Sequence, residues 1–264
     1  MNKGPIHQIK QAYWSMLTAW HRWRHPTAKV YSPHAWLDAV IRHLPRQADR
    51  IVYVDGGAHD GQFARQLRAH LPQLEIHAFE PNADLFPRLQ DNLQSAPGKC
   101  YPWALAAQSQ AMEIFINASP MTSSLLPRSQ LSQRYFDQVT RLREKRVIQA
   151  VSLDDWFSRS GLDRVDLLKL DLQGYELEAL KGAGRLLDRG IGCIYCEVHF
   201  APFYEGSAMF ADVDALLRSH GYRLYNLYHL ATHLPEGQIG SADALYVLDR
   251  PASGAPAAST RRAA

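Results

Sequence analysis

The sequence has little cysteine, with three in 264 residues, at Cys100, Cys193 and Cys196. So few cysteines exclude a disulfide framework and indicate a reducing compartment. Cys193 and Cys196 have C-x-x-C spacing, but they lie in the apolar run "IGCIYCEV", which is typical of a buried strand. A redox pair is expected at a helix N-terminus instead. One such pair also cannot form a four-cysteine zinc site.

Long apolar runs are also lacking. No run approaches the roughly 20 residues that a transmembrane helix needs. Residues 6–23 are interrupted by His, Gln, Lys and Arg, which excludes a signal peptide. The formal net charge of +3 is too small to indicate nucleic-acid binding. We therefore expect a cytoplasmic enzyme.

Both ends of the chain differ from the part between them. Residues 1–30 lack acidic side chains, since the first is Asp38, and apolar residues recur there at helical spacing: Ile6, Ile9, Tyr13, Leu17 and Trp20. Such a basic amphipathic helix can lie on an anionic membrane or pack on the protein's own body, and the short apolar stripe favours packing. Residues 251–264 are small, basic and contain proline, so we expect a disordered tail.

Residues 31–250 alternate between short apolar runs and segments with helical spacing, which predicts one doubly wound, mostly parallel α/β sheet. The last two strands are close in sequence and predict an antiparallel hairpin at one edge. A polar, basic stretch, residues 119–146, fits this scheme least and is expected to be a lid or substrate loop. The predicted strands are 50–54, 75–79, 101–106, 112–117, 165–170, 191–198, 222–227 and 244–248, and the predicted helices are 34–43, 62–70, 83–94, 175–187 and 211–219.

The stretch "IVYVDGGAHDGQFARQL", residues 51–67, reads as a buried strand, a glycine-rich turn and a helix start. A nucleotide is expected at such a turn, but Asp55 at the strand end would repel a pyrophosphate. Its carboxylate suits a ligand with an ammonium group and no phosphate, such as S-adenosylmethionine. The alternatives are a helix N-cap for Asp55 and a tight turn for the glycines.

Glu80 ends the next strand, in "IHAFEPN". An acid at this position can accept hydrogen bonds from both ribose hydroxyls of an adenosine. Enzymes that bind NAD also use such an acid, so Glu80 indicates adenosine without separating the two cofactors. The predicted cofactor residues are Asp55, Gly56, Gly57, His59, Gly61, Glu80, Pro81, Asn82 and Asp171.

The ordered motifs "VDGGAHDG", "AFEPN", "ALAA", "SSLL", "SLDDWF", "LLKLDLQGYELEALKGA" and "CEVH" resemble the FkbM family of S-adenosylmethionine-dependent methyltransferases, over about residues 51–225. The resemblance implies a class I methyltransferase (Rossmann-like) fold, a seven-stranded sheet with an antiparallel edge strand, and O-methylation. It assigns Asp55, Gly57 and Gly61 to the first cofactor motif. Gln173 departs from the family, which often has an acid there.

Methyl transfer to a hydroxyl needs alignment of the reacting atoms and a base or metal that takes the proton. Candidates lie where strands end: Asp171, Glu197 and His199. His199 is the first choice, because its ordinary pKa lies near neutrality; a histidine hydrogen-bonded at a strand end is the alternative. The three could also hold a divalent cation, which we do not favour because their spacing is not diagnostic.

Two further groups of polar side chains stand out. Lys169 lies within an apolar strand and shares a face with Asp171, so an ion pair is expected. Ser123 and Ser124, in the polar insertion, could bind a polyhydroxylated acceptor, although serines are common in loops. The predicted acceptor is a small molecule, glycan or glycolipid.

Three other functions remain as alternatives. An NAD-dependent oxidoreductase is opposed by Asp55. The short motifs of nucleic-acid methyltransferases, Asn/Asp-Pro-Pro-aromatic and Pro-Cys, are both missing from the sequence. A non-catalytic interaction module on a methyltransferase fold stays open, because a fold alone does not determine function.

Overall fold

The computed structural model describes residues 35–232 and 234–249. Contacts divide the chain into two compact units, Met1–Asp38 and Ala39–Ala264, and the second contains all the strands described below. The predicted N-terminal amphipathic helix and the predicted C-terminal tail lie outside the described residues. Within the described part, no helix is long and apolar enough to cross a membrane.

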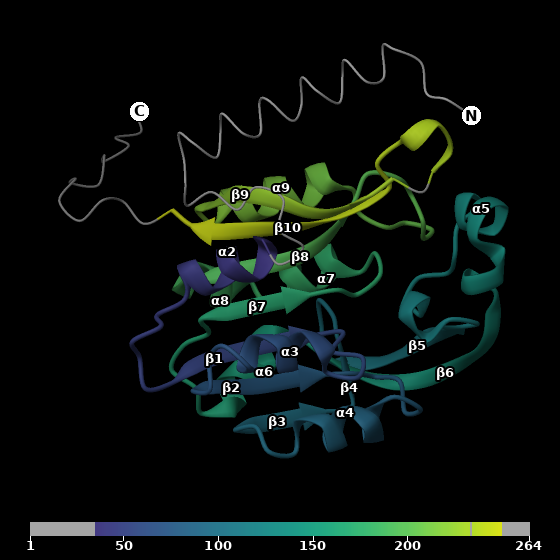
Figure 1. The fold of residues 1–264 in the computed structure, drawn as a ribbon. Coiled ribbons are helices and arrows are strands. Elements are labelled where there is room, and N and C mark those ends of the chain that lie inside the picture. The colour runs from purple at the N-terminus through teal and green to yellow at the C-terminus, as the bar shows by residue number, and fades with distance from the viewer. Residues whose placement is uncertain (1–34, 233, 250–264) are drawn as a thin grey trace, which may run out of the picture. The chain divides into compact units, whose positions relative to one another are not determined.

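The centre of the second unit is a seven-stranded sheet with the order β3-β2-β1-β7-β8-β10-β9 (Figure 1). The strands β3, β2, β1, β7 and β8 pair in parallel. Their carboxyl ends therefore meet at one edge of the sheet, where ligands of doubly wound folds bind. The bounds are β1 Ile51–Gly56, β2 Leu74–Phe79, β3 Gly98–Tyr101, β7 Leu167–Leu170, β8 Cys193–His199, β9 Tyr222–Ala231 and β10 Ser241–Leu248.

The predicted antiparallel hairpin lies at one side of this sheet. β10 runs antiparallel to both β8 and β9, and β9 forms the outer edge. This arrangement confirms the predicted class I methyltransferase fold, a doubly wound and mostly parallel sheet with one reversed strand.

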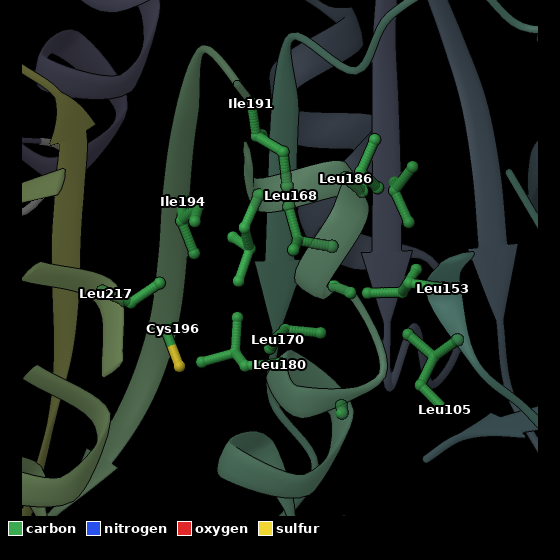
Figure 2. Close-up of a cluster of buried hydrophobic side chains, with 14 of the residues drawn as sticks. Leu105, Leu153, Leu168, Leu170, Leu180, Leu186, Ile191, Ile194, Cys196 and Leu217 are labelled. Carbon is green, nitrogen blue, oxygen red and sulfur yellow. The ribbon is translucent and has the colours of Figure 1, made fainter. Parts of the chain in front are cut away.

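Alternation along the strands sends different side chains to the two faces of the sheet. Leu168, Leu170, Ile194 and Cys196 face one side and are fully buried (Figure 2). The helices that cover them are α6 Leu153–Ser160, α7 Glu176–Lys181, α8 Gly184–Arg189 and α9 Phe210–Ser219.

The opposite face of the sheet carries aromatic and charged residues of β1, β7 and β8. Tyr53 and Tyr195 both contact the ring of Phe63, with centroids 6.0 and 5.4 Å away. Phe63 belongs to α3 Gln62–Arg68, so this helix covers the second face. Two further helices are α2 Ala35–His43 and α4 Phe86–Leu93.

The predicted strand 101–106 is wrong as a single element. It divides at Pro102 into β3, in the main sheet, and β4 Trp103–Leu105, in a second sheet of order β4-β6-β5. Proline has no N–H for a ladder and interrupts the strand there. β5 spans Gln110–Asn117 and β6 spans Leu142–Val151.

The stretch 119–146, predicted to be a lid or substrate loop, is regular structure rather than a loop, and several of its residues line the hollows described below. It contains a 3₁₀ turn, η1 Pro120–Thr122, the helix α5 Gln130–Thr140 and the first half of β6. Ser129 caps α5 by accepting a hydrogen bond from the Ser132 N–H. Most side chains in the first half of β6 are exposed, which is why its sequence looks like a loop.

The predicted helix 175–187 is divided at Gly182. A Cβ at this position would lie 2.2 Å from the carbonyl oxygen of Ala106. Only glycine permits this close approach, and the helix restarts after it as α8.

Leu168→Ala tests the apolar face in Figure 2. We expect the free energy of unfolding to fall by about 2–5 kcal/mol, because the truncation leaves a cavity among fully buried neighbours. The matched control is Val147→Ala, at a position that is 77% exposed, where the change should stay within about 0.5 kcal/mol. Urea unfolding followed by circular dichroism measures both. Equal effects of the two substitutions would contradict the packing described.

Candidate active site

A hollow lies at the carboxyl ends of β1, β2 and β7. Trp103, Leu105, Ile114 and Leu125 supply apolar walls, and none of its described lining residues is a lysine or arginine. The lining also includes predicted cofactor residues, namely Gly57, His59, Glu80, Pro81 and Asp171.

Gly57 brings two loops together at the floor of this hollow. Its φ is +73°, and an added Cβ would lie 2.0 Å from the backbone oxygen of Asp171. No residue with a side chain fits this contact without moving the backbone. Gly57 therefore holds the turn after β1 directly against the loop after β7.

Glu80 presents a buried carboxylate to the same hollow. One oxygen accepts the N–H of His59 at 2.9 Å, and the other accepts the N–H of Asn82 at 2.8 Å. Burial raises the pKa of Glu80 to about 7, although these two N–H donors oppose the shift. Each oxygen retains a free lone pair, so the carboxylate can still accept hydrogen bonds from the hydroxyl groups of a ligand.

Asp55, a predicted cofactor residue, lies near the end of β1, as expected. Its side chain is fully buried and does not line the hollow. The nearest cation is the ammonium of Lys169, 3.3 Å away. The ammonium partner expected from a ligand is thus supplied by the chain itself, on the neighbouring strand β7. The alternative role as a helix N-cap is wrong, since Gly61 is the N-cap of α3.

Lys169 makes the predicted ion pair with Asp171, at 3.6 Å, in addition to the pair with Asp55. Its ammonium also donates to the carbonyl oxygen of Gly57 at 3.3 Å. Burial alone would lower the pKa of Lys169, but the two carboxylates outweigh it and raise the pKa above its usual value. The lysine therefore stays charged inside the sheet.

Three other predicted cofactor residues support the hollow without lining it. Gly56 leaves no room for a Cβ, which would lie 2.7 Å from Leu105 and 2.9 Å from Leu170. Gly61 starts α3 at a φ of +79°. Asn82 donates its N–H to Glu80 and accepts the N–H of Asp84. Their place is in the turns that shape the hollow.

A second hollow, of about 620 Å³, adjoins the first. Gln173 lines both, and its backbone has a φ of +55°. Its amide nitrogen donates to Asp171 and to Glu197, at 2.9 Å each, and its amide oxygen accepts the Tyr204 hydroxyl at 2.8 Å. Gln173 thus connects the end of β7 with the end of β8 across the boundary between the hollows.

Two of the predicted catalytic residues, Glu197 and His199, line the second hollow, and the third, Asp171, lines the first. His199 Nε2 lies 3.4 Å from Glu197. His199 Nδ1 is buried and has no hydrogen-bond partner among the described residues. A buried, unpaired nitrogen is costly unless a ligand completes it.

Burial shifts the pKa values of this pair in opposite directions. It lowers the pKa of His199, despite the opposing charges of Glu176 and Asp171. Burial and the nearby Asp171 carboxylate raise the pKa of Glu197 well above its usual range. At neutral pH, His199 therefore has a lone pair available to accept a proton.

The remaining predicted residues lie in the first hollow. Ser123 and Ser124 line it beside the cofactor residues, and the Ser124 hydroxyl donates to the Gln173 carbonyl at 2.8 Å. Asp171, Glu197 and His199 do not form a metal site: among the described residues, no three His, Cys, Asp or Glu side chains are arranged to hold a metal ion.

Sequence reasoning missed the residues that surround the second hollow. Phe136 comes from α5, within the stretch expected to be a loop, and Phe203 and Tyr204 follow β8. Their rings pack around His199 and one another, with centroids 5.4–6.0 Å apart. In the sequence, the aromatic pair "FY" shortly after the strand that carries His199 could have indicated Phe203 and Tyr204.

Comparisons with known proteins find methyltransferases among the relatives of this chain. The chain is 27% identical to the hexuronic acid methyltransferase AglP of Haloferax volcanii, over 61% of each chain, so it spans less than two thirds of that relative. It is 24% identical to the 2-O-methyltransferase NoeI of Sinorhizobium fredii, over 72% of this chain and 76% of NoeI.

A solved structure of methyltransferase FkbM from Methylobacillus flagellatus matches 75% of this chain and 44% of that chain, with 20% identity and a TM-score of 0.49. The model of the methyltransferase FkbM domain matches residues 55–224. This match covers more than half of the chain, and the protein therefore belongs to the FkbM methyltransferase family.

Proposed function

We propose that the chain transfers a methyl group from S-adenosylmethionine to a hydroxyl of a sugar, glycolipid or related small molecule. The observation that carries this proposal is the pair of adjoining hollows. One presents a buried acid among apolar walls, and the other presents an unprotonated histidine. The names of AglP and NoeI, which refer to a hexuronic acid and to 2-O-methylation, support a sugar hydroxyl as the acceptor.

The residues of the first hollow fit S-adenosylmethionine. Glu80 can accept hydrogen bonds from the two ribose hydroxyls. Trp103, Leu105 and Ile114 can make apolar contacts with the adenine ring. Asp171 adds a carboxylate for the positively charged end of the cofactor. The lack of lysine and arginine among the described lining residues suits a ligand without phosphate and disfavours NAD.

Bound S-adenosylmethionine supplies a methyl group on a positively charged sulfur. The acceptor hydroxyl must lose its proton as its oxygen is methylated, and His199 can accept that proton. Gln173 holds Glu197 by a hydrogen bond, and Glu197 in turn lies beside the His199 ring.

Affinity for S-adenosylmethionine should fall as the pH is lowered through 7. Free Glu80 takes up a proton near pH 7, and a protonated carboxyl has lost acceptor capacity for the ribose hydroxyls. Binding must then expel that proton, so the affinity should decrease by up to about tenfold per pH unit below 7. Calorimetric titrations at pH 6, 7 and 8 measure this slope.

Glu80→Gln should weaken binding at pH 8 and flatten the slope. Glu113→Gln, at an exposed position of β5, is the matched control and should behave as wild type. Unchanged affinity and slope in Glu80→Gln would contradict the role of Glu80.

His199→Gln should separate binding from chemistry. We expect S-adenosylmethionine affinity within about twofold of wild type, because His199 lines only the second hollow. The rate of methyl transfer should fall by about 10²–10⁴-fold, the usual contribution of a general base. Mass spectrometry of methylated glycoside acceptors gives the rate. The calorimetric titration used for Glu80→Gln gives the affinity for S-adenosylmethionine. A variant with the wild-type rate would exclude His199 as the base.

A further inference from the structure

The second hollow combines a polar floor with aromatic and apolar walls. The floor contains Gln173, Glu197 and His199, and the walls include Phe136, Phe203 and Leu234. Sugar rings have the same two characters, with hydroxyls around the rim and apolar C–H faces. Aromatic side chains are suited to such C–H faces because they offer a large, rigid apolar surface.

The hollow has hydrogen-bonding groups but no positive charge. None of its described lining residues is a lysine or arginine. His199 is uncharged at neutral pH because burial lowers its pKa. The carboxyl groups closest to this floor are Glu197, within the hollow, and Asp171, one hydrogen bond beyond Gln173. The nearby ammonium of Lys169 does not line the hollow and is already paired with Asp55 and Asp171.

An anionic acceptor would bind less tightly because the described lining of the hollow has no cation. A carboxylate moved from water into the hollow loses hydration, gains no opposite charge and approaches Asp171. A hydroxyl meets no such cost, and it can satisfy His199 Nδ1, which is buried without a partner among the described residues. The 2.9 Å hydrogen bonds of Gln173 hold the floor in place for this contact.

We infer that the second hollow is the acceptor site and that it selects an uncharged sugar ring, with one hydroxyl on His199 and a C–H face against Phe136 and Phe203. The inference rests on the proposed function and adds the charge class of its substrate. It also separates this chain from AglP, whose name refers to a hexuronic acid.

The test compares neutral methyl glycosides with the matching uronides, in the gluco, galacto and manno series. Each pair differs only in a CH₂OH against a carboxylate. Binding to the full chain with S-adenosylhomocysteine is measured by saturation-transfer-difference NMR, and methyl transfer by mass spectrometry. At least one neutral glycoside should bind and be methylated, with its uronide weaker by about tenfold or more.

Val139→Arg provides a gain of function in the same assay. Val139 lines the second hollow and is 42% exposed, so a guanidinium placed there can reach a bound carboxylate. The neutral-to-uronide preference should shrink by about threefold or more. Val147→Arg, at the exposed position of β6 outside both hollows, adds the same charge and should leave the preference unchanged.

Uronides that bind as well as the neutral glycosides would overturn the inference. So would a protein that binds S-adenosylmethionine but neither binds nor methylates any neutral glycoside. Failure to bind S-adenosylmethionine at all would overturn the proposed function instead. Thermal unfolding of both arginine variants confirms that they are folded, and the comparison of wild-type ligands stands without them.

Discussion

The ion pair between Lys169 and Asp55 is the constraint on which the site depends. Parallel strands β1 and β7 place the two side chains opposite each other, and the ammonium also reaches Asp171 and the carbonyl of Gly57. One buried cation thereby holds the turn after β1 and the loop after β7, the two loops that meet at Gly57. Removing the ammonium of Lys169 would leave the fully buried Asp55 without the cation that it pairs with, which is strongly destabilising. The floor of the first hollow is built on this pair.

From that floor, the site extends through three hydrogen bonds of 2.8–2.9 Å and the 3.4 Å contact between Glu197 and His199. Asp171 leads to Gln173, Gln173 to Glu197 and Tyr204, and Glu197 to His199. The chain of contacts runs from the first hollow to the second, across the ends of β7 and β8. A methyl donor and an acceptor held in the two hollows would meet near Gln173. The Gln173 amide is uncharged, so it donates to both carboxyl groups without placing a third acid between them.

Much of the fold could be predicted because buried parallel strands are near-continuous apolar runs, as in Ile51–Val54. Glycines and acids that follow such strands also indicated the first hollow, including Gly57 and Glu80. The ion-pair partner of Asp55 could not be predicted, because a sequence shows that a carboxylate ends a strand, not that a lysine lies opposite it. The second hollow could not be predicted, since it joins α5, the end of β8 and the β9–β10 connection, which only the folded chain brings together.

A crystal structure of the protein with S-adenosylhomocysteine tests the central claim most directly. The account predicts the ribose hydroxyls on the Glu80 carboxylate, the adenine among Trp103, Leu105 and Ile114, and the sulfur directed toward Gln173 and the second hollow. A ligand bound away from Glu80, or a sulfur that faces away from the second hollow, would contradict the arrangement of donor and acceptor sites described for this chain.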